Sequence, residues 1–215
     1  MSAFLHTAVT ATAGLLTGFA LTAGPLWHQH RAVTAARFQA SHDDVTGLPN
    51  RRAALTLLHR AAQQGRPHGL VLLDLDKFKN INDTYGHEAG NDLLTEVGRR
   101  LAALRYPVAL AARLSGDEFV LVVSGGPADV HAAAIAARHA IRAAPGMLGE
   151  HAVAVRASVG YACARPGRSP LDLLRDADEA MYRAKTRAAQ GHGPHPGHPA
   201  PHQKPPGRCR DWPRP

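Results

Sequence analysis

The sequence lacks the features on which several classes of protein depend. Aromatic residues make up only 5% of its 215 residues, which argues against the base-stacking platforms of single-strand nucleic-acid binders, so no nucleic-acid partner is expected. The two cysteines, Cys163 and Cys209, are too few and too far apart for a disulfide framework or a zinc cluster. Lys185-Thr186 has no glycine-rich lead, which excludes a Walker-type phosphate loop. The simplest interpretation is a reducing, intracellular domain.

The overall composition fits one globular domain with extensions, since 45% of the residues are hydrophobic and 20% are charged. The formal charge of +8 and the pI near 10.2 favour anionic partners such as nucleotides, nucleic acid or lipid headgroups. Part of this charge lies in residues 189–215, which are rich in Gly, Pro and His. That composition predicts a disordered tail whose histidines bind metal weakly at most.

Residues 8–27 carry no formal charge and are long enough to cross a bilayer as one helix. Arg31 and Arg37 follow this segment and no Lys or Arg precedes it, so the positive-inside rule places the rest of the chain in the cytoplasm. We therefore expect a single-pass anchor in the inner (cytoplasmic) membrane. Two alternatives remain, a dimerising helix that does not insert and a signal peptide. The expected organisation is an anchor and connector (1–40), a folded domain (41–188) and the tail (189–215).

A first acidic cluster follows a buried strand. Residues 69–73 are a continuous apolar run, typical of a strand that is buried on both faces, and Asp74 and Asp76 come directly after it. Carboxylates at this position are costly unless something pairs with them, and Mg²⁺ shared with substrate phosphates is a natural partner. Lys77 and Lys79 suit phosphate oxygens. The alternative is that Asp76 only caps a following helix.

A second acidic cluster lies at the tip of an expected β-hairpin. A short apolar run at 108–114, broken by Arg113, and a second one at 119–123 flank the turn Ser-Gly-Asp-Glu. Such a pair of runs around a glycine-containing turn predicts two antiparallel strands. Asp117 and Glu118 are adjacent carboxylates at this turn. Asp and Gly are common in turns for backbone reasons alone. The hairpin acids therefore indicate a functional site only in combination with the first acidic cluster.

The other segments complete an α/β (α+β) pattern. Asn50 is placed to cap a helix that runs to about residue 64, a second helix follows Gly86, a third spans 127–144, and a last amphipathic helix follows a strand at 152–162. This order predicts a central, mostly antiparallel sheet covered by helices. Two acidic clusters on neighbouring strands could hold two divalent ions. The residues alone therefore indicate a metal-dependent nucleotidyl or phosphoryl transferase.

Six motifs recur in the order of one known family. They are DDVTGLPNRR (43–52), DLDKFKNIND (74–83), GHEAG (86–90), RLSGDEF (113–119), SVG (158–160) and ADEAMYRAK (177–185). On these residues the chain resembles the GGDEF family of diguanylate cyclases over about residues 41–187. The resemblance implies a ferredoxin-like, cyclase-type palm. It also implies that a homodimer joins two GTP molecules into cyclic di-GMP, with release of pyrophosphate.

The resemblance also implies roles for single residues. Asp74, Asp117 and the carbonyl of Leu75 should bind Mg²⁺, with Mn²⁺ possible, and Glu118 should act as a further ligand or help to activate the 3′-hydroxyl. The nucleotide should be held by two further groups of residues. The first group should bind the phosphates and consists of the main-chain amides of Asp76, Lys77 and Phe78 together with the side chains of Lys79 and Lys185. The second group should contact the guanine edge and consists of Asn82 and Asn91.

Four departures from the family pattern bear on activity. Ser115 replaces the first glycine of the signature and, being small, should leave the hairpin intact. Asn91 stands where the family usually has Asp, and it offers guanine one uncharged acceptor. Residues 185–190 lack the family's arginine that supports the phosphates, unless Arg187 substitutes. Residues 106–109 lack the Arg-x-x-Asp of the inhibitory product site, so product feedback through it should be absent. The alternatives to an active enzyme are a weakly catalytic GTP-binding regulatory module and a cyclase with relaxed base choice.

Overall fold

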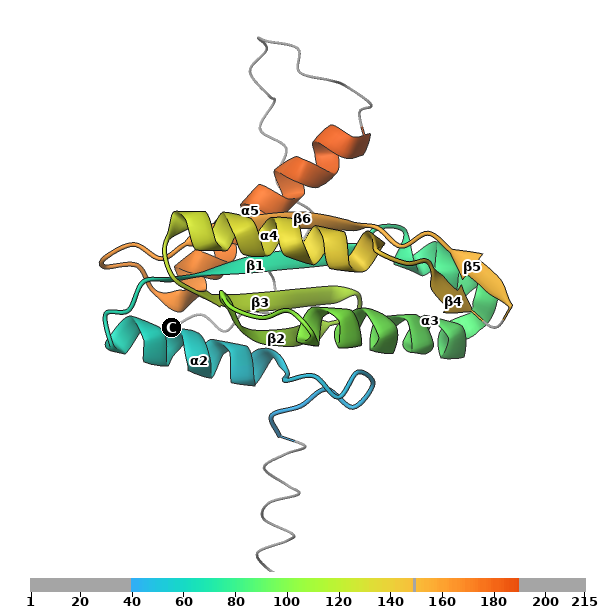
Figure 1. Cartoon of the computed structure of the whole chain (residues 1–215), viewed down its shortest axis with the longest axis horizontal. Coiled ribbons are helices and arrows are strands. Elements are labelled where there is room, and N and C mark those ends of the chain that lie inside the picture. Colours follow the sequence, from blue (N-terminus) through green and yellow to red (C-terminus); the bar gives the residue numbers. More distant parts are fainter. Residues whose placement is uncertain (1–39, 149, 190–215) are drawn as a thin grey trace, which may run out of the picture. The chain divides into compact units, whose positions relative to one another are not determined.

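A four-stranded antiparallel sheet forms the centre of the molecule (Figure 1). The computed structural model describes residues 40–148 and 150–189. Its strands are β1 (His68–Leu75), β2 (Val108–Ser115), β3 (Glu118–Ser124) and β6 (Ala157–Cys163), in the order β2-β3-β1-β6. With the intervening helices this is a βαββαβ arrangement of the ferredoxin-like type. The expected antiparallel sheet is confirmed.

Two helices cover each face of the sheet. Leu93, Leu94 and Val97 of α3 (Phe78–Ala102) share one core with Val130 and Ala137 of α4 (Pro127–Arg142). The opposite core contains residues of α2 (Arg51–Gln63) and α5 (Pro170–Ala189). The sandwich therefore has two separate cores, one on each side of the sheet (Figure 1).

Strand β1 is buried along its whole length, as its apolar run predicts. Successive side chains of a strand point to opposite faces. Leu73 and Leu75 accordingly pack with α3 and α4, and Leu70 and Leu72 pack with α2 and α5. The same alternation places Asp74 on the α5 side, at the end of the strand.

The helix starts agree with the sequence in one case and differ in two. Asn50 caps α2, because its side chain accepts a hydrogen bond from the N–H of Ala53 at 3.2 Å. The hypothesis that Asp76 caps the next helix is wrong, since α3 begins after Lys77 without a side-chain cap. An alternative role for Asn91, as the cap of a helix that begins at Asp92, is excluded as well, because α3 runs through Asn91 and departs from helical geometry inside only at Gly86.

The predicted strand at 152–162 is two strands in two different sheets. β5 (His151–Val153) pairs with β4 (Gly146–Leu148) in a small separate sheet. β6 pairs with β1, starting from the pair Ala157 and Leu75. Residues 154–156 therefore link two sheets, and alternation of side chains along the sequence does not reveal such a change of partner.

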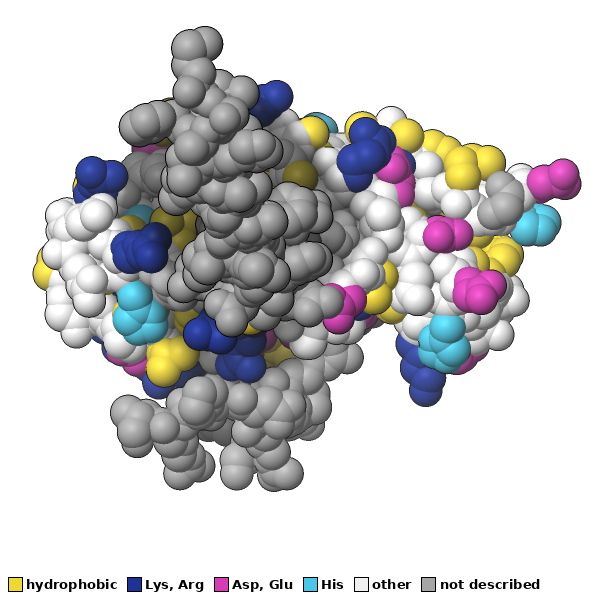
Figure 2. Space-filling view, turned by 90° about the horizontal axis from the view of Figure 1, so that it is seen from below, with side chains coloured by type: hydrophobic (Ala, Val, Ile, Leu, Met, Phe, Trp, Pro, Cys, Tyr) yellow, Lys and Arg dark blue, Asp and Glu magenta, His cyan; other side chains and the backbone are white. Residues whose placement is uncertain are grey.

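Charged side chains are unevenly distributed on the face seen in Figure 2. Lys and Arg gather toward the end that carries α2, whereas Asp and Glu gather toward the end that carries α3 (Figure 2).

The segment 8–27 and the tail lie outside the described residues, so the anchor and the tail stay predictions. Among the helices in the described ranges, none combines the length and the apolar character needed to cross a membrane.

Candidate functional site

The buried carboxylate of Asp74 is the centre of the candidate site. Asp74 is 1% exposed, and its Oδ1 accepts a hydrogen bond from Lys185 Nζ at 2.6 Å. Glu118 lies opposite Asp74 in the β1–β3 register, and opposed residues of antiparallel strands place their side chains on the same face. Two carboxylates and one ammonium group thus converge where β1, β3 and α5 meet.

The end of β1 is held between the hairpin tip and the start of β6. The N–H of Leu75 donates to the carbonyl of Asp117 at 3.2 Å, and the N–H of Asp76 donates to the carbonyl of Arg156 at 2.9 Å. Ser158 Oγ donates to Asp76 Oδ1 at 2.7 Å. The main-chain amide of Asp76 is therefore already engaged, which leaves those of Lys77 and Phe78 for the predicted phosphate contacts.

The turn from β1 into α3 is tight. Lys77 has φ 60° and ψ 26°, and it is the one non-glycine residue with positive φ in the described part of the chain. A left-handed conformation costs a residue with a side chain about 1–2 kcal/mol. Such strain is typical of functional sites, and here it lets the chain enter α3 directly after the carboxylates.

The hairpin tip is fixed from inside by Arg113. Its Nε and Nη2 donate to the carbonyl of Gly116 at 2.9 and 2.7 Å, and its Nη1 contacts Asp43 Oδ1 at 2.8 Å. Burial raises the pKa of Asp43, but hydrogen bonds from Arg113 and Thr46 outweigh this and lower the pKa below its ordinary value. Ser115 ends β2 without left-handed backbone, so the expectation that the hairpin survives this serine is confirmed.

The carboxylates at this site fit a magnesium ion that shares its ligands with substrate. In the described ranges, no group of three or more His, Cys, Asp and Glu is arranged to hold a metal by itself. Mg²⁺ usually takes one or two protein carboxylates and completes its shell with waters and phosphate oxygens. Asp74 and Glu118, with Asp117 in the adjoining turn, supply hard oxygen ligands of this kind. These three carboxylates therefore suit a metal ion that is bound together with the substrate phosphates.

Asn82, one of the two residues predicted to read the guanine edge, has an unpartnered polar atom. Asn82 Oδ1 is buried and accepts no hydrogen bond in the described structure. It lies against Gly90, where any Cβ would collide with it, and the ring of Phe78 lies beside the same glycine. Asn91 follows Gly90 and is exposed. Asn82 and Gly90, the chain neighbour of Asn91, are thus brought together by the two parts of α3 on either side of Gly86. The guanine-reading role of Asn82 and Asn91 stays a prediction.

A cavity of about 700 Å³ adjoins the turn after β1. Lys77 and Lys185 line it, together with Asp76 and Ser158. Lys79 is exposed on the first turn of α3 and does not line this cavity. Arg156 also lines the cavity but was absent from the sequence prediction, because nothing in its local pattern marks it.

The comparisons with known proteins agree with these observations. The family model described as "Diguanylate cyclase, GGDEF domain" matches residues 40–190. The bifunctional diguanylate cyclase/cyclic di-GMP phosphodiesterase MucR of Pseudomonas aeruginosa is 39% identical over 160 residues, which are 71% of this chain and 23% of MucR. Diguanylate cyclase DgcS of Shewanella oneidensis is 35% identical over 151 residues, which are 68% of this chain and 50% of DgcS.

A solved structure shares the fold. The coiled coil and GGDEF domain of DgcB from Caulobacter crescentus, in complex with c-di-GMP, matches with a TM-score of 0.70 at 26% identity. The match covers 80% of this chain and 95% of that chain. By contrast, the chain spans only 23% of MucR and 50% of DgcS.

Proposed function

Because the chain belongs to the GGDEF family, we propose that it is a diguanylate cyclase that condenses two GTP molecules into cyclic di-GMP and releases pyrophosphate. One observation carries the proposal. The buried Asp74 faces Glu118 of the hairpin and pairs with Lys185 of α5, which gathers acidic and basic groups where a nucleotide triphosphate needs them. An in-line displacement at phosphorus requires this combination of metal ligands and phosphate cations.

Lys185 has a double role in the proposed reaction. Without substrate, its ammonium group compensates the buried charge of Asp74, which would otherwise be costly. Its side chain is 43% exposed, so it can turn from Asp74 to a β- or γ-phosphate oxygen. Mg²⁺ or Mn²⁺, when bound by Asp74, Asp117, Glu118 and the Leu75 carbonyl, would neutralise phosphate charge and favour ionisation of the attacking 3′-hydroxyl.

We propose a homodimer as the active form. One domain holds one GTP, and each 3′-hydroxyl must attack the α-phosphate of the other nucleotide, so two domains have to face each other. The expected anchor in residues 8–27 and the connector to residue 40 would raise the local concentration of domains at the inner membrane. The domain would then act from the cytoplasmic side. Residues 106–109 offer no basic or acidic side chain, so we propose that product inhibition through that position is absent.

Analysis of the products made by the purified full-length chain tests the proposal. With Mg²⁺ and GTP we expect cyclic di-GMP and two equivalents of pyrophosphate, and with ATP alone no cyclic product. A mixed or adenine-containing cyclic dinucleotide in the GTP and ATP reaction would instead support relaxed base choice. GTP binding without any product would support the regulatory-module alternative.

Asn91→Asp is expected to tighten GTP and to sharpen discrimination against ATP. The guanine N1–H and N2 amine are donors, and a carboxylate accepts both with charge, whereas an amide offers one uncharged oxygen. A charge-assisted hydrogen bond is worth roughly 1.5–3 kcal/mol, so the Michaelis constant for GTP should fall by about ten- to a hundredfold. Steady-state kinetics with GTP and ATP on both proteins measures this. Equal constants in the two proteins would remove Asn91 from the guanine site.

A further inference from the structure

The cavity beside the turn after β1 is lined by more basic than acidic side chains. Three of its lining residues, Lys77, Arg156 and Lys185, are cations, and Asp76 is its one acidic residue. Oδ1 of Asp76 accepts a hydrogen bond from the Ser158 hydroxyl at 2.7 Å, and Lys185 is paired with Asp74, so Lys77 and Arg156 are the cations that give the cavity its positive excess. A hollow with this excess of positive charge attracts an anion of more than one charge.

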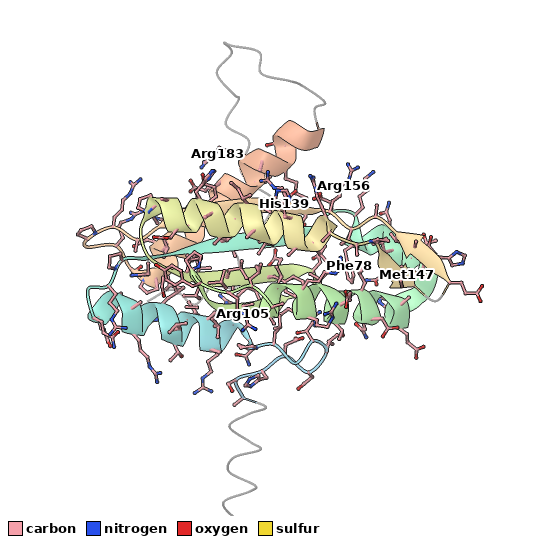
Figure 3. The ribbon with its side chains drawn as sticks, in the orientation of Figure 1. Phe78, Arg105, His139, Met147, Arg156 and Arg183 are labelled. Carbon is pink, nitrogen blue, oxygen red and sulfur yellow. The ribbon has the colours of Figure 1, made fainter. Side chains whose placement is uncertain are left out.

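Arg156 is the one charged residue lining this cavity to which neither the sequence nor the family resemblance assigns a role. It is exposed, and within the described ranges its side chain forms no ion pair. Figure 3 shows Arg156 at the outer surface, near the end of the sheet at which β6 begins and α3 starts. Its guanidinium is therefore available to a ligand.

The backbone of Arg156 ties it to the nucleotide site. Its carbonyl accepts the Asp76 N–H at 2.9 Å, two residues beyond the buried Asp74. The same cavity reaches Lys185, which pairs with Asp74 at 2.6 Å. Arg156 is thus held next to the main chain of residues 76–78, which the family resemblance places against the phosphates.

We propose that Arg156 is a phosphate-binding residue, which contacts the terminal phosphates of the nucleotide from the cavity that it shares with Lys77 and Lys185. A guanidinium suits this task because its planar fork donates two parallel hydrogen bonds to phosphate oxygens. Residues 185–190 lack the arginine that the family resemblance leads one to expect, unless Arg187 substitutes, and Arg156 would supply such a charge from the link between β5 and β6. The inference rests on the proposed function for the identity of the ligand.

Calorimetric titration of the full-length chain in Mg²⁺ buffer tests the inference with three probes, GTP, GMP and inorganic tripolyphosphate. Arg156→Gln should weaken GTP and tripolyphosphate by about three- to thirtyfold and leave GMP unchanged, because GMP lacks the terminal phosphates. Arg156→Lys keeps the charge but loses the planar fork of the guanidinium. Its affinities for GTP and tripolyphosphate should therefore lie between those of the wild type and those of Arg156→Gln. Arg138→Ala on the exposed side of α4 removes the same charge away from the cavity and should change none of the three affinities.

Each outcome decides one question. Unchanged tripolyphosphate and GTP affinities in Arg156→Gln would overturn the role of Arg156, and so would an equal loss in Arg138→Ala, which would indicate only a general charge effect. Product formation is measured separately on the wild type. A wild type that binds tripolyphosphate through Arg156 yet makes no cyclic di-GMP would overturn the proposed function and leave the phosphate site in place.

Discussion

Replacing Asp117 by alanine is expected to abolish Mg²⁺-dependent release of pyrophosphate from GTP, with a loss of at least about a hundredfold in turnover. Asp117 lies in the turn between β2 and β3, where its carbonyl already holds the N–H of Leu75 at 3.2 Å. The backbone contact survives the substitution, so the end of β1 keeps its place. What is lost is a carboxylate that no neighbouring side chain can replace.

Asp74→Asn should have the same effect on turnover, for a second reason. It removes a metal ligand and also the charge that pairs with Lys185 at 2.6 Å. Asp44→Ala is the matched control, since Asp44 is an exposed acid to which no role is assigned. A coupled pyrophosphate assay on the four proteins, with circular dichroism to confirm the fold, gives the comparison. Turnover above a few per cent of wild type in either site variant would refute the metal-ligand assignment.

Gly160→Ala is expected to destabilise the fold by about 3 kcal/mol or more, at the upper end of what overpacking costs. A Cβ at this position in β6 would overlap the main-chain nitrogen of Met181 and the main-chain oxygen of Ala177, both in α5. Main-chain atoms of a helix cannot turn aside as a side chain can. The helix would have to move away from the sheet, and Lys185 would move with it.

Thermal unfolding measures the effect of this substitution. For a domain of this size, 3 kcal/mol corresponds to a fall in Tm of about 6–12 °C. Gly126→Ala is the control, because Gly126 has φ −90° and a Cβ there would meet nothing within 4 Å; it should cost about 1 kcal/mol or less. If the two variants have the same Tm, the close approach of α5 to β6 is not a determinant of stability.

The sequence by itself determined the local elements and most of the residues of the candidate site. The apolar run of β1, the capping Asn50 and the glycine-containing turn after Ser115 are decided by neighbours a few residues away, so periodicity and turn chemistry reveal them. Asp74 stands out because a carboxylate directly after a buried strand is costly unless something pairs with it, and Asp117 stands out as part of a second acidic cluster on a neighbouring strand. Motif order then indicated the family.

Only the tertiary structure decided which of these residues meet. Lys185 pairs with Asp74 across 111 positions, Ser158 with Asp76 across 82, and Arg113 with Asp43 across 70. The split of residues 151–163 between two sheets and the place of Arg156 in the basic cavity belong to the same class of facts. Such contacts follow from strand order and from the side of the sheet on which each helix packs. These depend on the burial of the whole apolar surface, which no short stretch of sequence encodes.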